Sequence, residues 1–338
     1  MNKQYILDFT KKVLSIDSPS GYTKKVIDFL IDEATKLGYK CELNRKGCLI
    51  VTVEGKSEKV LGLSAHVDTL GLMVRSINGD GTLRLTTIGG PLLPTYDGEY
   101  CKVYTRDNKV YSGTVLSNSP AVHVYKDASS LPRDVDHMHV RLDEVVKCKD
   151  DVKKLGIETG DFIAIDPKTV ITENGFIKSR FLDDKMSSSI LFGLMKYLKD
   201  NNIKPAMTLK ILFSTYEEVG FGASSIFDCE EFISVDMGCI GLDLNCSEYD
   251  VSICAKDSGG PYDYDITNKF IEISKKLNLS YVVDIYPYYS SDATAALRGG
   301  NNTKAGLIGP GICASHGMER THYQAVENTL KLLIEYVK

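Results

Sequence analysis

Apolar residues recur at helical spacing over the start of the chain. Ile6, Phe9 and Val13 share one face of a first predicted helix, and a second apolar stripe spans residues 27–37. The run VLGLSAHVDT (60–69) then predicts a buried strand that passes directly into polar residues. Helices followed by a buried strand are typical of α/β proteins.

The pattern changes between residues 71 and 168, where short alternating runs are separated by turn sequences. TLRLTTI (82–88), YCKVYT (100–105) and KVYSGTVL (109–116) predict strands joined by tight turns. This texture indicates a small β-rich unit.

An α/β pattern returns after residue 168. The predicted elements are strands in LKILFST (209–215), EFISVDM (231–237) and AGLIGPG (305–311), and helices over 266–277 and 326–337. We therefore expect an α/β domain that is interrupted by an inserted β domain.

Composition and charge exclude several classes of protein. The chain has 338 residues and a formal net charge of −5, which disfavours a general nucleic-acid or membrane-surface binder. No apolar run approaches the ~18 residues that span a bilayer, and the N-terminus lacks the apolar core of a signal peptide. The nine cysteines are scattered, without a CxxC motif, so we expect free thiols in a cytoplasmic protein.

Acids and histidines follow the carboxyl ends of the predicted strands. Open α/β sheets collect functional residues at this edge, and a mixture of imidazole and carboxylate suits zinc, cobalt or manganese. Each residue alone also fits a role without metal: a core histidine, a helix N-cap or a turn. The candidates are His66, Asp68, Asp183, Asp184, Glu217, Glu218, Asp236 and His316.

Together these residues form a pattern that resembles the M42 family of metallo-aminopeptidases. The matching segments run in the family's order over nearly the whole chain. They are SPSGY (18–22), AHVDTLGLMV (65–74), GDFIAIDP (160–167), FLDDK (181–185), EEVGFGA (217–223), SVDMG (234–238), SSDATAA (290–296) and VENTLKLL (326–333).

The resemblance implies both a fold and an assembly. The expected fold is an α/β/α catalytic domain with a mixed sheet, formed by residues 1–70 and 169–338. Residues 71–168 would form an inserted β-barrel-like domain used for dimerisation and assembly. A homo-oligomer is implied, built from dimers and extending to a dodecamer.

The resemblance also implies two divalent metal ions per subunit. Zinc is expected, with cobalt or manganese as alternatives. One ion would be held by His66 and Asp236, and the other by Glu218 and a late histidine. Asp183 would bridge them, beside a cis peptide bond to Asp184.

The late histidine has two candidates, because this chain departs from the family pattern there. Counting from the strand before it and from VENT after it favours His316 as the ligand, with Glu319 at the position of the family's acid. His322 would then line the substrate site.

The implied activity is an aminopeptidase that removes N-terminal residues from peptides. Glu217 would be the general base, and Asp68 would orient the imidazole of His66. The alternative is a di-metal amidohydrolase acting on N-acyl amino acids, which would use the same ligands.

Other classes fit less well. KDSGGPYD (256–263) contains the sequence found around trypsin-like serine nucleophiles, but that fold is all-β. A glycosidase would need two carboxylates facing one another across a bond, whereas Glu217 and Glu218 are neighbours that diverge from one strand. The presence of Glu217 with the full ligand set argues against a non-catalytic protein.

The segment DIYPYYSSDATAALRGG (284–300) is expected to shape the substrate pocket. Arg298 there has two interpretations: it favours acidic N-terminal residues, or it forms a surface salt bridge, which is the more common role of an arginine.

Overall fold

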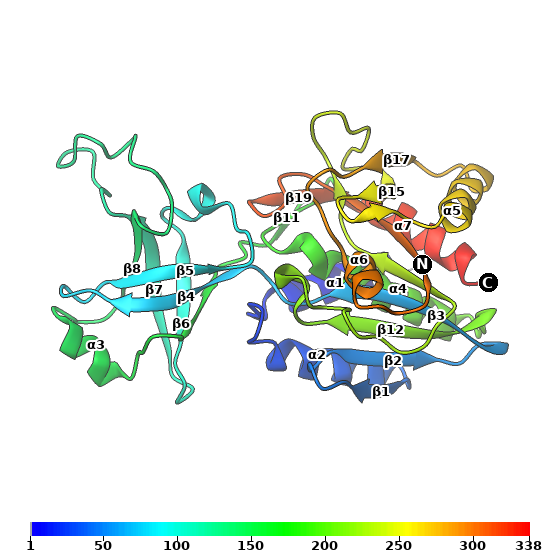
Figure 1. The fold of residues 1–338 in the computed structure, drawn as a ribbon, viewed down its shortest axis with the longest axis horizontal. Coiled ribbons are helices and arrows are strands. Elements are labelled where there is room, and N and C mark those ends of the chain that lie inside the picture. The colour runs from blue at the N-terminus through cyan, green and yellow to red at the C-terminus, as the bar shows by residue number, and fades with distance from the viewer. Residues whose placement is uncertain (1) are drawn as a thin grey trace. The chain divides into compact units, whose positions relative to one another are not determined.

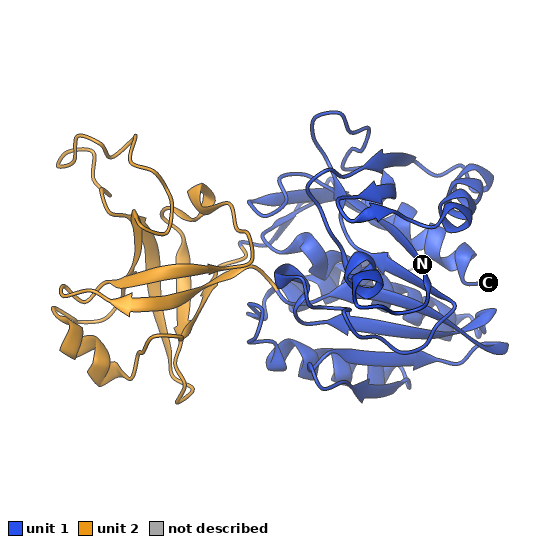
Figure 2. Ribbon diagram, in the orientation of Figure 1, with its two compact units in different colours: residues 1–68, 168–338 blue, residues 69–167 orange. Residues whose placement is uncertain are grey.

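The computed structural model describes residues 2–338, which divide into two compact units (Figures 1 and 2). The first unit contains the chain up to Asp68 and Lys168–Lys338, and the second contains Thr69–Pro167. Among residues 2–338, no helix combines the length and apolar character that crossing a membrane requires.

The first unit is built from helices around a large sheet. Its helices are α1 (Lys3–Leu14), α2 (Lys24–Lys36), α4 (Leu182–Asp200), α5 (Tyr264–Lys276), α6 (Asp292–Arg298) and α7 (Tyr323–Tyr336), with a 3₁₀ turn at Glu217–Val219. Its strands are β1 (Lys40–Leu43), β2 (Leu49–Val53), β3 (Ser57–His66), β10 (Val170–Ile171), β11 (Phe176–Ser179), β12 (Met207–Ser214), β13 (Glu231–Val235), β14 (Gly238–Cys239), β15 (Val251–Asp257), β16 (Gly260–Pro261), β17 (Tyr281–Ile285), β18 (Lys304–Ile312) and β19 (Glu319–His322).

The large sheet is mixed, with the order β1-β2-β12-β3-β13-β18-β15-β16, and with β14 on β18 and β17 on β15. Strands β12, β3, β13 and β18 are parallel to one another, whereas β2 and β15 run antiparallel to their neighbours. The carboxyl ends of the four central strands therefore meet at one edge. A separate three-stranded sheet has the order β10-β11-β19.

Helices cover both faces of the sheet. Neighbouring residues of a strand point to opposite faces. Phe213 of β12 contacts Phe192 of α4, with ring centroids 5.2 Å apart, whereas Leu212 packs in a cluster with Ala293 and Ala296 of α6. Phe9 of α1 stacks on Phe192 at 4.4 Å. These contacts make an α/β/α arrangement, in which α1 and α4 share one face and α6 lies on the other.

Local sequence explains where several helices begin. The Asn2 side chain accepts from the backbone N–H of Tyr5 at the start of α1, and Asp263 caps α5 in the same way. Ser291 caps α6, a short helix in the segment after β17. Its alanines pack close to the sheet, which places the end of the helix at Arg298 beside the strand ends.

The second unit is a closed barrel with the strand order β4-β5-β8-β7-β6-β9. Its elements are β4 (Gly71–Ile77), β5 (Leu83–Ile88), a 3₁₀ turn (Leu93–Tyr96), β6 (Tyr100–Tyr104), β7 (Val110–Ser117), β8 (Met138–Leu142), α3 (Lys149–Leu155) and β9 (Phe162–Ile165). The pattern of alternating runs predicted the strands but missed α3. That helix is a seven-residue, highly charged segment with a single buried residue, Val152, so it has no apolar stripe to detect.

The predicted fold class is confirmed. The mixed sheet and the closed barrel both occur, in the order that the sequence pattern indicated. The apolar runs that predicted the central strands became β3, β12, β13 and β18, which together carry the core of the first unit.

The aromatic contacts around Phe192 generate a stability prediction. Its side chain is fully buried between Phe9 and Phe213. Phe192→Ala should lower the free energy of unfolding by about 3–5 kcal/mol, because it removes apolar contact and leaves a cavity. Leu43→Ala, on an edge strand where the side chain is exposed, is the matched control and should change it by less than about 0.5 kcal/mol. Urea denaturation of both variants measures this; similar losses would contradict the packing described.

Candidate metal centre and substrate pocket

Strand ends bring four of the candidate residues together. His66 is the last residue of β3, Glu217 and Glu218 form the 3₁₀ turn just beyond β12, and Asp236 follows β13. Because β12, β3 and β13 are adjacent and parallel, all four side chains emerge at the same edge of the sheet.

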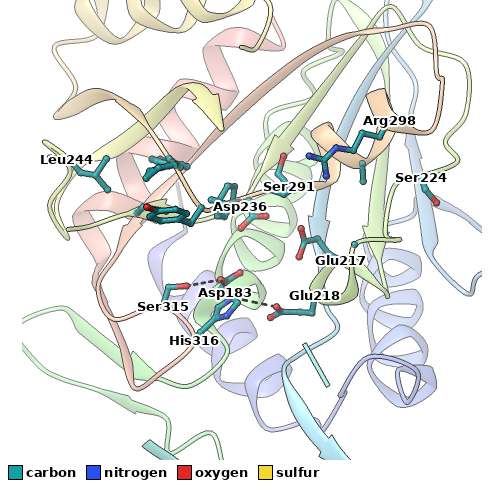
Figure 3. A pocket seen from close by; sticks show the side chains of 18 of the residues that line it. Asp183, Glu217, Glu218, Ser224, Asp236, Leu244, Ser291, Arg298, Ser315 and His316 are labelled. Atoms are coloured by element: carbon teal, nitrogen blue, oxygen red, sulfur yellow. Dashed lines mark hydrogen bonds and ion pairs between the residues drawn. The ribbon is translucent and has the colours of Figure 1, made fainter. Parts of the chain in front are cut away.

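Asp183 lies between two histidines. Its Oδ1 is 3.1 Å from Nε2 of His66, and its Oδ2 is 3.6 Å from Nε2 of His316. Figure 3 shows Asp183 beside His316. Ser315 donates a hydrogen bond to the same Oδ2 at 3.1 Å. The peptide bond between Asp183 and Asp184 is cis, and both residues have non-helical dihedral angles although they stand at the start of α4. They are therefore not an ordinary N-cap pair.

Unpaired carboxylate oxygens suit a cation site. Glu218 directs Oε2 to within 3.6 Å of Nε2 of His316, while its buried Oε1 has no hydrogen-bond partner within residues 2–338. Oδ1 of Asp184 is buried and unpaired in the same way. The potential ligand atoms form two groups, and within each group the atoms lie within 4.8 Å of one another. The first group is His66, Asp183 and Glu218, and the second is His66, Asp184 and Asp236. This donor set of imidazole and carboxylate fits divalent cations such as zinc.

The electrostatics of the cluster agree with this interpretation. Burial, reinforced by the charge of Asp183, raises the pKa of Asp236 to about 7. Burial also raises the pKa of Glu217 well above its usual value, with Asp236 adding to the effect, and does the same for Glu218 beside Asp183. Burial alone would lower the pKa of His66, but its hydrogen bond to Asp183 and the nearby carboxylates raise it. Such clustered shifts are typical of functional sites.

Asp68 lies beside His66 and also contacts the turn that carries the two glutamates. Nδ1 of His66 is hydrogen-bonded to the backbone carbonyl of Asp68 at 3.0 Å, whereas the carboxylate is 3.7 Å away. The carboxylate instead accepts from the hydroxyl of Ser20 at 2.5 Å and from the backbone N–H groups of Glu217 and Glu218 at 3.2 and 3.3 Å. Asp68 thus fixes the turn that carries both glutamates.

Glu319 performs the same task for another pair of residues. Its buried carboxylate accepts from the backbone N–H of Asp183 at 3.1 Å and from that of His316 at 3.0 Å. One side chain from β19 therefore connects two segments that are more than 130 residues apart in the sequence.

The expectation that His322 lines the substrate site is wrong. His322 caps α7, where its Nδ1 accepts from the N–H of Gln324, and its Nε2 contacts the carbonyl of Asn174 at 2.8 Å. It is absent from the pocket that His316 lines. The trypsin-like reading also fails, because the hydroxyl of Ser258 donates to the carbonyl of Tyr289 and not to a histidine.

A pocket of about 1100 Å³ opens above the cluster (Figure 3). Its floor contains Asp183, Glu217, Glu218, Asp236 and His316. Its walls come largely from the segment that the sequence singled out, 284–300, together with residues after β14. Ser315 and the loop around Leu242 were missed, since an isolated serine and a loop leucine carry no periodic or motif signal. Ser20 lies in the matching segment SPSGY, but its contact with Asp68 was not predicted.

Comparisons with known proteins agree with the geometry. Residues 47–332 match the family model described as M42 glutamyl aminopeptidase. The chain is 43% identical over 335 residues to "Putative aminopeptidase YhfE" of Bacillus subtilis (strain 168), covering 98% of this chain and 97% of that protein. It is 27% identical to a glutamyl aminopeptidase of Lactococcus lactis subsp. cremoris (strain MG1363), covering 68% and 66%. Among solved structures, the TET1 peptidase of Pyrococcus horikoshii matches with a TM-score of 0.85 at 22% identity, covering 98% and 99%.

The buried carboxyl groups predict how metal binding depends on pH. In metal-stripped protein, a carboxyl such as Asp236, whose pKa is raised from 3.8 to about 7, holds a proton that the unfolded chain has lost. The stripped protein should therefore lose stability as pH rises from about 4 to 7. Zinc competes with these protons, so the gain in melting temperature on adding zinc should widen between pH 5 and 7.5. Differential scanning calorimetry measures the gain, and an equal gain at both pH values would contradict the assignment.

Proposed function

The chain belongs to the M42 glutamyl aminopeptidase family, and we propose that its buried cluster is a di-metal centre that releases N-terminal residues from peptides. Membership makes the chain a peptide hydrolase. The proposal adds the number of ions, the ligands and the residue that moves the proton.

The position of Asp183 is the observation that carries the proposal. Its two carboxylate oxygens face different histidines, His66 at 3.1 Å and His316 at 3.6 Å. A buried carboxylate directed at two imidazoles suits the bridging ligand of a pair of cations. A single structural ion pair would need only one of them.

The ligands then divide into two sets. We assign His66 and Asp236 to one ion, Glu218 and His316 to the other, and Asp183 to both. Zinc is the expected metal, because such ligands bind it more tightly than manganese or cobalt. Bound cations would polarise the peptide carbonyl and lower the pKa of the attacking water.

Glu217 is the proposed general base. It stands next to a ligand in sequence, yet its carboxylate is 3.7 Å from Nε2 of His66 and faces the pocket (Figure 3). Its Oε atoms can take a proton from water and return it to the leaving amine. Asp68 keeps this side chain in place through the backbone N–H of Glu217.

Substrate selection follows from the charge of the floor. A free α-ammonium group is attracted to the carboxylates around Asp183 and Glu218, whereas an acylated terminus carries no such charge. Peptides with free N-termini are therefore the proposed substrates. The alternative is an amidohydrolase acting on N-acyl amino acids, and the substrate test below distinguishes the two activities.

We also propose homo-oligomeric assembly through the barrel. The TET1 peptidase is described as assembling into a tetrahedron or a large octahedral shell. The barrel unit of this chain exposes apolar side chains at Leu92, Tyr100, Val122, Val124 and Val145, which are 53–93% exposed. The proposed oligomer is a dodecamer built from dimers. We also propose a cytoplasmic location, which the nine free cysteines support.

Hydrolysis of aminoacyl-p-nitroanilides tests the activity. Metal-stripped protein should be inactive, and adding back zinc, cobalt or manganese should restore cleavage of substrates with a free amino group. Matched N-acetylated substrates should remain uncleaved, because they lack the ammonium group. Preferred cleavage of the acetylated set would support the amidohydrolase instead.

Two adjacent glutamates give the sharpest variant pair. Glu217→Gln should retain both metals but lower kcat by about 10²–10⁴-fold, because the amide cannot accept the proton. Glu218→Ala should lose metal, since it removes a ligand. Glu272→Gln, on an exposed part of α5, is the control for the charge change. Metal content by mass spectrometry and kcat are measured together; equal metal loss in both variants would overturn the assigned roles.

A further inference from the structure

One phenol hydroxyl beside the candidate metal centre has no part in the chemistry proposed so far. Tyr289 lines the pocket and lies in the segment between β17 and α6. Its hydroxyl oxygen is buried and has no hydrogen-bond partner within residues 2–338. Nearly all buried polar groups in proteins are hydrogen-bonded. An unpaired one next to a cluster of candidate metal ligands therefore points to a partner that arrives with the substrate.

Three acids of the cluster are electrostatic neighbours of this hydroxyl. Burial, together with the charges of Asp236, Asp183 and Glu217, raises the pKa of Tyr289 well above its ordinary value. Burial and the charge of Asp183 raise the pKa of Asp236, and the hydroxyl of Tyr289 is one of the groups that counter this rise. No hydrogen bond of good geometry joins the phenol to any of these carboxylates. The hydroxyl therefore lies close to the candidate ligands and the proposed base without being committed to any of them.

The backbone and the ring of Tyr289 are both held in place. The N–H and the hydroxyl of Ser258 donate to the carbonyl of Tyr289 at 3.0 and 2.7 Å. The Asp-Ser-Gly-Gly loop (257–260) thus fixes this backbone. The ring packs edge-on against Tyr286 with centroids 5.3 Å apart, and the hydroxyl of Tyr286 pairs with that of Ser252. The hydroxyl of Tyr289 consequently has its position before a substrate binds.

Two other hydroxyl groups that line the pocket are already engaged. Ser315 donates to Oδ2 of Asp183 at 3.1 Å, and the hydroxyl of Ser291 pairs with that of Tyr262 at 2.8 Å. Ionised carboxylates can only accept hydrogen bonds. A phenol keeps its proton at neutral pH, because its ordinary pKa is about 10, and it can therefore donate. Tyr289 offers the pocket an uncommitted donor beside groups that only accept.

We propose that Tyr289 is a catalytic residue whose hydroxyl donates a hydrogen bond to the carbonyl oxygen of the scissile peptide bond as that oxygen becomes negatively charged. This rests on the proposed aminopeptidase function. The oxygen of water forms the new bond to the carbonyl carbon, Glu217 passes the proton of water to the leaving amine, and the carbon–nitrogen bond breaks. The phenol keeps its own proton throughout. A donor that is fixed in advance stabilises the charged transition state more than the neutral substrate.

Tyr289→Phe tests the proposal, because it removes the hydroxyl and keeps the ring. The variant should retain its metal ions, keep KM within about 3-fold and lower kcat by about 10–10³-fold, since the lost bond forms only in the transition state. A phosphinate analogue of the best-cleaved dipeptide imitates the tetrahedral, negatively charged transition state. Its dissociation constant, measured by titration calorimetry on zinc-loaded protein, should rise by the factor by which kcat falls. Metal content is measured by mass spectrometry on the same samples.

Tyr264→Phe is the matched control, because Tyr264 is an exposed tyrosine at the start of α5, outside the pocket. It should leave kcat and phosphinate binding unchanged. The proposal is overturned if Tyr289→Phe also leaves both unchanged, or if kcat falls without a matching loss of phosphinate affinity. Loss of metal from Tyr289→Phe would overturn it as well, because that result would make Tyr289 a positioning residue for Asp236.

The wild-type enzyme separates this proposal from the function on which it rests. If wild type with any of the three metals cleaves no aminoacyl substrate and binds no phosphinate analogue, the proposed function fails, and the role of Tyr289 fails with it. If wild type cleaves these substrates and Tyr289→Phe cleaves them equally well, the aminopeptidase function stands and only the role of Tyr289 fails.

Discussion

The burial of several carboxylates at one point is the constraint around which the first unit is organised. Asp183, Asp184, Glu218 and Asp236 converge at the edge where four parallel strands end. Buried like charges are unfavourable unless protons, hydrogen-bond donors or cations compensate them. The raised pKa values of three of these acids and the unpaired oxygens of Asp184 and Glu218 are two consequences of the same crowding.

Hydrogen bonds around the cluster fix the positions of its acidic side chains. Asp68 fixes the turn with both glutamates, and Glu319 fixes the backbone at Asp183 and His316. Both carboxylates accept hydrogen bonds from backbone N–H groups in the segments that carry the candidate ligands. The candidate ligands are consequently held by elements from both ends of the chain, so the first unit has to be complete before these side chains can converge. The barrel is inserted where β3 ends, at the point where a long excursion of the chain does not disturb the strand order.

The central strands and most of the candidate ligands could be predicted from the sequence, because both leave local patterns in it. Apolar runs marked β3, β12, β13 and β18, and the acids just beyond them marked the edge where the pocket lies. The environment of Arg298 was not accessible. The guanidinium of Arg298 lies close to Gly259, which is distant in sequence and reaches it only through tertiary packing. The N–H groups that donate to Asp68 could not be predicted from the sequence for the same reason. They are backbone groups about 150 residues away, which leave no trace in side-chain patterns.

Anomalous diffraction at the zinc absorption edge, from crystals of zinc-loaded protein, tests the central claim most directly. The account predicts two peaks per subunit on either side of the carboxylate of Asp183. One should be coordinated by His66 and Asp236, and the other by Glu218 and His316, with Glu217 outside both coordination shells. A single peak, a peak coordinated by Glu217, or peaks away from Asp183 would contradict it.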